Sequence, residues 1–260
     1  MEVFKYLKQI YKGNFSLANH IMLFSLLGIL AILLNNVFAY VGSGLVYFTF
    51  FAVPPANKVE LSINLFFAIL IMLYLFGYEY KFINQNFHNE TFALPKFDLI
   101  PSVMLLKVLP LFFMWQIYYL FILILGSFIL LSFGNSTISY IFYSLLICML
   151  PFVHLVLITF TNDFVLDKSL VNPFIVFKFL DKTLSDVVCL FIQVLMLAVI
   201  PFFVVYGIAF GAHKIAAEPY KLSLYLFDLC IALYFISILR FVYIAELMRI
   251  AKEKFLINRV

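Results

Sequence analysis

The sequence predicts an all-α integral membrane protein with six transmembrane helices and three amphipathic helices on the cytoplasmic surface of the membrane. Hydrophobic residues make up 66% of the 260 residues and charged residues only 12%, whereas a soluble domain contains roughly a quarter charged residues. Six apolar segments are long enough to cross a hydrocarbon core, which takes roughly 20 helical residues. Mixed apolar and basic segments before the odd-numbered spans have the pattern of interfacial helices.

The six predicted spans cover residues 19–41, 60–80, 109–133, 139–161, 187–211 and 222–244. No long stretch has the composition of a soluble domain, so we expect residues 1–260 to form a single polytopic membrane domain. The first span is longer than the apolar core of a signal peptide and lacks a small-residue cleavage site, so it should stay as an anchor. Between the first two spans, residues 42–59 are apolar but too short to cross, which suits either a re-entrant or an interfacial segment.

The basic residues predict how the spans are oriented. With a cytoplasmic N-terminus, all but three of the seventeen lysines and arginines fall on the cytoplasmic side, the exceptions being Lys58, Lys214 and Lys221. Cytoplasmic loops of membrane proteins carry an excess of Lys and Arg. We therefore expect a multi-pass protein with both its N-terminus and its C-terminus in the cytoplasm.

Two segments with nearly the same pattern precede the first and fifth spans: "VFKYLKQIYKG" (residues 3–13) and "VNPFIVFKFLDKTLSD" (residues 171–186). At about 100° per residue, the polar residues of each segment fall on one arc of a helix. They are Lys5, Lys8, Gln9 and Lys12 in the first, and Lys178, Asp181, Lys182 and Ser185 in the second. We expect the lysines at headgroup level and the apolar side in the acyl boundary.

A weaker version follows the second span, where "PKFDLIPSVMLLKVLP" (residues 95–110) has Lys96, Asp98, Ser102 and Lys107 as its polar members. Each of the three segments leads into an odd-numbered span. This regularity predicts an internal repeat of three units, each made of an interfacial helix, a span, a turn and a span. The alternative is that lysines simply flank the helices, as in any bilayer protein.

The end of the second span, "GYEYKFINQNFHNETFALPKFD" (residues 77–98), has Gly77-Tyr78 closing a helix, a polar linker and then Leu94-Pro95-x-Phe97-Asp98. This pattern resembles the bacterial membrane proteins of domain-of-unknown-function family 4013, which are broadly similar to the membrane region attached to some glycerophosphodiester phosphodiesterases. The linker, usually acidic in that family, has only Glu90 here. The resemblance implies a six-span fold in a bacterial inner membrane, and it brings no established activity or functional residue.

Polar side chains inside spans are costly in hydrocarbon and are therefore candidate functional residues. Asp228 is the sharpest of them, because its span is otherwise apolar around it and Arg240 lies about 18 Å further along the helix. We expect Asp228 to bond Asn35 or Asn36, to face a hydrated cavity, or to keep a proton. Both a proton- or cation-coupled site and a hydrogen bond between helices fit these residues.

The remaining candidates are weaker. Gln116, His154 and Gln193 lie in the inner halves of their spans, and His154 suits either a proton relay or a structural hydrogen bond. Gly207-x-x-x-Gly211 could allow two helices to pack closely. Arg240, near the inner end of the sixth span, should reach the headgroups. The residues expected to contact lipid headgroups are Lys5, Lys8, Lys12, Lys178, Lys182 and Arg240.

No catalytic motif, metal site or cofactor site is indicated. The sequence has no GxSxG, HExxH or P-loop pattern, and its three cysteines lie singly inside apolar segments. The scattered lysines do not suggest nucleic-acid binding.

Two functions remain. The first is a non-enzymatic membrane protein that acts on the bilayer or on a membrane partner, as a scaffold, an accessory subunit or a lipid-organising factor. It would contact anionic headgroups and could pair with another membrane protein or a second copy of itself. The alternative is a small-solute or ion transporter or channel, with an intramembrane polar path around Asp228. Replacing Asp228 by Asn should abolish coupled transport but leave a scaffold working.

Overall fold

The computed structural model describes residues 2–12, 16–41, 57–87, 92–98, 174–215 and 218–253. Those residues form five α-helices and no β-strand: α1 (Glu2–Lys12), α2 (Ser16–Val41), α3 (Lys58–Phe87), α6 (Phe174–Ile215) and α7 (Glu218–Ala251). The all-α class is thereby confirmed for this part of the chain. The predicted spans 109–133 and 139–161 lie outside the described residues, and so does nearly all of the 42–59 segment. The six-span count and the threefold repeat stay predictions.

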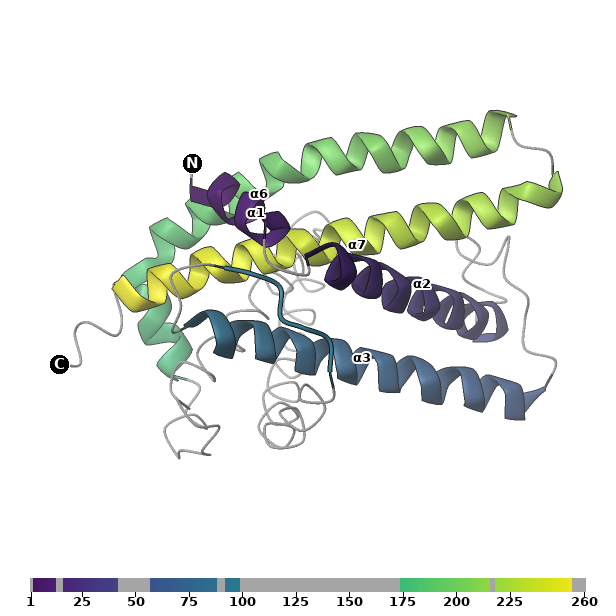
Figure 1. The fold of residues 1–260 in the computed structure, drawn as a ribbon, viewed down its shortest axis with the longest axis horizontal. Coiled ribbons are helices and arrows are strands. Elements are labelled where there is room, and N and C mark those ends of the chain that lie inside the picture. Colours follow the sequence, from purple (N-terminus) through teal and green to yellow (C-terminus); the bar gives the residue numbers. More distant parts are fainter. Residues whose placement is uncertain are drawn as a thin grey trace, which may run out of the picture.

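Four of the helices are long and apolar enough to cross a membrane, which supports a membrane-embedded protein. The stretches concerned are Ser16–Leu34, Lys58–Asn86, Asp181–Gly211 and Leu226–Ala251. Figure 1 shows α2, α3, α6 and α7 running along one common direction, with α1 and the C-terminal end of α7 at the same end of the bundle. Helix α7 packs against each of the other four described helices, and it lies between α6 on one side and the α2–α3 pair on the other (Figure 1).

Helices α3 and α7 continue well past the predicted ends of their spans. Helix α3 begins after Asn57, whose Oδ1 accepts a hydrogen bond from the backbone N–H of Glu60, as an N-cap does. It continues beyond residue 80 to Phe87, and α7 continues beyond residue 244 to Ala251. The helices continue there because their apolar residues still find protein partners.

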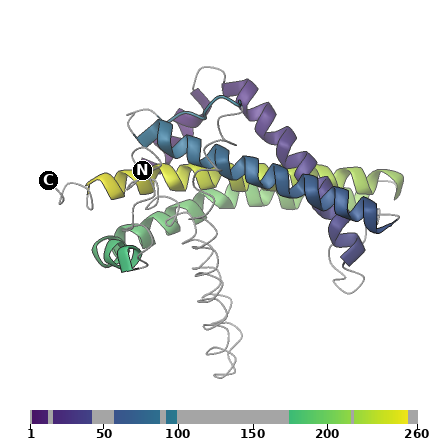
Figure 2. The same ribbon diagram turned by 90° about the horizontal axis from the view of Figure 1, so that it is seen from below.

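Helix α6 joins the second predicted interfacial segment and the fifth span into one helix of 42 residues. At 1.5 Å per residue such a helix is about 63 Å long, roughly twice the thickness of a hydrocarbon core. Figures 1 and 2 show that its N-terminal part points in a different direction from the remainder, which runs beside α7. The change of direction suits an amphipathic beginning that lies across the end of the bundle.

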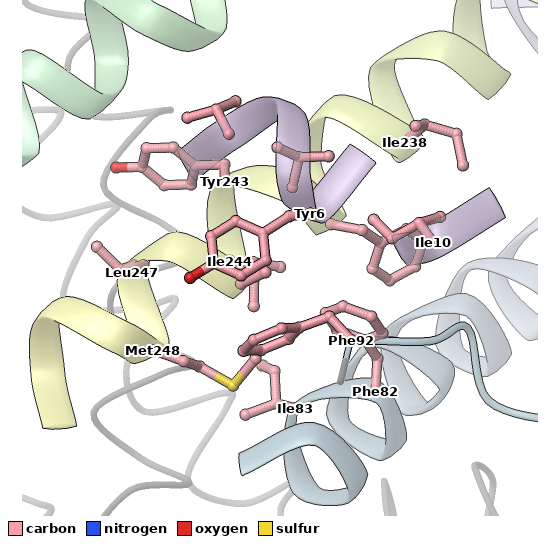
Figure 3. Packing of buried hydrophobic residues seen from close by; sticks show 14 of the residues in the cluster. Tyr6, Ile10, Phe82, Ile83, Phe92, Ile238, Tyr243, Ile244, Leu247 and Met248 are labelled. Carbon is pink, nitrogen blue, oxygen red and sulfur yellow. The ribbon is translucent and has the colours of Figure 1, made fainter. Parts of the chain in front are cut away.

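The first predicted interfacial helix is α1, and one face of its apolar side packs against the protein instead of facing the acyl boundary that we expected. Val3, Tyr6 and Ile10 are buried in the core of the protein, at the spacing of one helix face. The ring of Tyr6 meets that of Phe92 edge-on, with 4.7 Å between centroids. In Figure 3, Phe92 lies between α1 and α3. Packing against the rest of the chain therefore fixes α1 and leaves Lys5, Lys8 and Lys12 exposed.

The third predicted interfacial helix does not begin at Pro95. Residues 92–98 form a non-helical linker, whereas residues 99–110 of the predicted helix lie outside the part of the chain that the structure describes. We refer to residues 92–98 as the α3 linker. It lies at the same end of the bundle as α1 and the C-terminal end of α7 (Figure 1), and we call this end, with the N-terminal part of α6, the basic end.

Candidate functional site

The α3 linker is held on one face of α3 by polar side chains. The Tyr78 hydroxyl donates to the carbonyl of Pro95 at 2.7 Å, and the Phe97 ring stacks on Tyr78 with 4.2 Å between centroids. Lys81 Nζ forms a 2.6 Å ion pair with Asp98 Oδ2. The separated parts of the sequence pattern on which the family resemblance rests, Gly77-Tyr78 and Leu94-Pro95-x-Phe97-Asp98, are thus direct neighbours.

Two asparagines fix the start of the same linker. Asn86 of α3 donates to the carbonyl of Ala93 and accepts from its N–H, both at 3.1 Å. Asn19 of α2 donates to the carbonyl of Leu94 at 3.2 Å. Because these amides satisfy backbone groups of a buried non-helical segment, the linker joins α2 to α3 in a defined position at the basic end.

A second polar contact joins α3 to α7. Arg240 Nε donates to Glu79 Oε1 at 2.9 Å, and the guanidinium lies 6.0 Å from the centroid of the Phe76 ring. The Glu79 side chain is buried and that of Arg240 is 36% exposed. Within the described residues, Arg240 Nη1 and Nη2 find no acceptor, and Glu79 Oε2 finds no donor. The pair therefore keeps binding capacity for a third group.

This ion pair lies at one end of a pocket of about 170 Å³ between α2, α3 and α7. The other lining residues are mainly apolar. They are Leu23, Leu30, Met72, Leu75, Phe76, Tyr78, Ser237 and Phe241. An apolar pocket with a few convergent polar groups is the usual form of a small-molecule site, so we take this pocket as the candidate functional site.

Sequence reasoning placed Arg240 at the inner end of its span but missed its partner, Glu79. A signal for Glu79 was available. Both residues directly follow a long apolar run, and the two spans were predicted to run in the same direction across the membrane. Their inner ends therefore lie at the same depth.

Asp228, the sharpest candidate from the sequence, is buried on α7, and its Oδ1 has no hydrogen-bond partner within the described part of the chain. No contact with Asn36 is found, although the sequence suggested one. A Cβ added to Gly28 would lie 3.3 Å from Cys230 Sγ. Gly28 of α2 and Cys230 of α7 therefore lie at the same position along the bundle axis. In antiparallel helices this register puts Asn36 about 9 Å beyond Asp228 along the bundle; the Asn35 side chain is outside the description.

We expect Asp228→Leu to stabilise the protein by about 1–3 kcal/mol, because it removes a buried polar group whose Oδ1 is unsatisfied. Thermal unfolding in detergent micelles, followed by circular dichroism, measures this change. A lower unfolding temperature for the leucine variant than for the wild type would show that Asp228 makes a stabilising contact beyond those described.

The other candidate polar residues are scattered. Gln193 lies half-buried on α6, away from the pocket, and Gln116 and His154 fall outside the described residues. Where side chains are described, no three His, Cys, Asp or Glu residues gather closely enough to hold a metal ion. Of the predicted headgroup contacts, Lys5, Lys8, Lys12 and Lys182 are exposed, and the Lys178 side chain is not described.

Sequence reasoning also missed a cluster around His20 of α2. Its Nδ1 lies 2.8 Å from the Tyr234 hydroxyl, which lies 3.1 Å from the Tyr11 hydroxyl. The Tyr11 ring stacks on the imidazole at 4.4 Å. Helices α1, α2 and α7 meet in this cluster, which anchors α1. No spacing pattern links Tyr234 to Tyr11 and His20, from which it is separated by 223 and 214 positions.

No protein-family model, curated protein or solved structure matches this chain. The resemblance to domain-of-unknown-function family 4013 therefore stays a prediction.

Proposed function

We propose that this chain is a non-enzymatic protein of the bacterial inner membrane that acts on the bilayer by holding phospholipids around its basic end. The observation that carries the proposal is the orientation of α1. Its face with Val3, Tyr6 and Ile10 is packed into the protein, and its lysines Lys5, Lys8 and Lys12 are exposed on a helix that this packing holds in place. Lys182 of α6 adds a fourth exposed cation on the same end of the bundle.

Lysines on a helix whose backbone is held in place suit headgroup binding better than lysines on a mobile segment, because less backbone freedom is lost when a lipid binds. A lysine near an anionic membrane surface contributes about 1 kcal/mol. Phe4 and Tyr11 on the same helix are 48% and 44% exposed, and aromatic residues favour the membrane–water interface. Together these side chains form a surface that matches both the charge and the polarity of the headgroup layer.

The alternative of a transporter or channel has less support. A polar path through the membrane needs several polar groups in sequence along it. By the register of Gly28 beside Cys230, the part of α2 that lies beside Asp228 contains Leu30 and Ala31, which are buried and apolar. We therefore favour the lipid-binding role.

The proposal is tested by electron paramagnetic resonance of spin-labelled phosphatidylglycerol in proteoliposomes, which measures how strongly an anionic lipid prefers the protein surface over phosphatidylcholine. We expect a variant with Lys5, Lys8, Lys12 and Lys182 all replaced by Gln to lose this preference by about fivefold or more. The matched control replaces Lys58 and Lys214, which are exposed at the opposite end, and should keep it. An unchanged preference in the fourfold variant would refute the proposed role of the basic end.

A further inference from the structure

The pocket between α2, α3 and α7 is polar at one end and apolar at the other. Glu79 lies seven residues after Met72 on α3, and Leu30 lies seven residues after Leu23 on the antiparallel α2. Seven helical residues correspond to about 10 Å. The pocket therefore extends about 10 Å from the charged pair toward the apolar middle of the bundle, parallel to the helices. A phospholipid likewise has a charged headgroup at one end and apolar acyl chains at the other, so its headgroup would match the charged end of the pocket.

The charged end offers both signs of charge. Arg240 uses Nε on Glu79 and keeps its two terminal nitrogens for another acceptor, within the described surroundings. A guanidinium is well suited to bind a phosphate with two parallel hydrogen bonds. Glu79 Oε2 can accept a hydrogen bond from an ammonium group. Because the pair is neutral overall, a headgroup with only a negative charge gains from Arg240 but is repelled by Glu79.

We propose that this pocket binds one phospholipid whose zwitterionic headgroup carries a primary amine, with the phosphate on Arg240 and the ammonium on Glu79. The inference rests on the proposed lipid-binding function and names the lipid class for this site. A quaternary choline headgroup cannot donate a hydrogen bond to Glu79, and a glycerol headgroup offers no positive charge. Phosphatidylethanolamine has the chemistry that complements both residues.

The size of the pocket fits part of a lipid. About 170 Å³ is less than the roughly 300–1,000 Å³ of sites that enclose a drug-sized ligand, so it takes the glycerol region and the upper part of one acyl chain. The remainder of the lipid would lie on α3, where Phe66, Ile69 and Leu70 are exposed and Met72 forms part of both surfaces. These residues continue the apolar end of the pocket toward the membrane.

The test is a titration of the detergent-solubilised protein with dioleoyl phosphatidylethanolamine, phosphatidylcholine or phosphatidylglycerol, followed by native mass spectrometry. We expect the tightest single site of the wild type to bind phosphatidylethanolamine at least tenfold more tightly than either of the other lipids, whereas anionic lipids around the exposed lysines bind more weakly. Arg240→Gln should lose this binding by about tenfold or more. The matched control is Arg249→Gln, since Arg249 is also 36% exposed and is paired with a buried glutamate, Glu246, but does not line the pocket.

Two further variants keep the result interpretable if Arg240→Gln folds poorly. Glu79→Gln leaves the arginine unopposed, so it should shift the preference from phosphatidylethanolamine to phosphatidylglycerol. Leu30→Trp fills the apolar end without touching a charge, and it should weaken all three lipids.

Equal binding of the three lipids by the wild type, or unchanged preference in Glu79→Gln, would overturn the inference. That result could occur while the lysine-dependent preference for anionic lipid persists, in which case only the pocket assignment fails. Loss of the lysine effect with intact pocket selectivity would instead reject the proposed role of the basic end.

Discussion

Arg240→Gln lowers the free energy of unfolding by about 3–5 kcal/mol, because it leaves the buried Glu79 carboxylate without its cation. The effect is large since Glu79 lies among apolar residues of α3 and α7, where an unpaired charge is poorly solvated. Arg240 also packs over the Phe76 ring, and this contact is lost as well. Equilibrium unfolding in mixed detergent micelles, monitored by circular dichroism, measures the change.

A double-mutant cycle separates the ion pair from simple loss of side-chain packing. Glu79→Gln combined with Arg240→Gln removes both charges, and it should recover most of the stability lost in the single arginine variant. A double variant as unstable as Arg240→Gln alone would mean that the stranded charge is not the cause.

Gly28→Leu destabilises the protein by about 2 kcal/mol or more, because it wedges α2 away from α7. Even a Cβ at Gly28 would lie 3.3 Å from Cys230 Sγ, a tight contact, and three further carbons must displace α7 or distort a rotamer. The same displacement separates His20 from Tyr234, which anchors α1. Thermal unfolding in detergent measures the loss, and Cys230→Ala in the leucine background should restore part of it.

Gly207→Leu on α6 is the matched control. A Cβ at Gly207 meets nothing within 4 Å, so the same substitution there should change stability by less than about 0.5 kcal/mol. A large loss at Gly207 and none at Gly28 would contradict the described packing of the bundle.

The contrast between these glycines illustrates what sequence reasoning could and could not predict. Gly207-x-x-x-Gly211 has the spacing of a close-packing motif, yet neither position has a near neighbour in the described structure. The close approach occurs at Gly28, a lone glycine in an apolar run. Close packing depends on which side chain faces the glycine, here Cys230, and spacing along one helix carries no information about that neighbour.

The helices themselves were predictable because their signals are local. Apolar length identified the four described helices that are long and apolar enough to cross a membrane, and the arc of lysines identified α1 as amphipathic. Hydrophobicity could not tell that the apolar side of α1 contacts the protein, because lipid and a protein core favour the same residues.

The α3 linker was mistaken for the start of a helix for a related reason. Its polar residues bond to α3, as in the Lys81–Asp98 pair, and do not form one helical arc.

The candidate pocket depends on contacts between residues more than 150 positions apart. Arg240 was singled out from its place at the end of a span, but its pairing with Glu79 required knowing that α3 and α7 lie side by side. Asp228 was singled out on equally good grounds, and the register of α2 against α7 separates it from Asn36. A single sequence indicates which segments form long apolar helices and indicates facing neighbours poorly.

The central claim, that this protein holds phospholipid, is tested most directly by mass spectrometry of the intact wild-type protein released from its native membrane without detergent. We predict that the protein emerges with bound phospholipid, and that lipid with a primary-amine headgroup forms a larger share of it than of the surrounding membrane. A protein that emerges free of phospholipid, or that carries lipids in the same proportions as the bulk membrane, would contradict the claim.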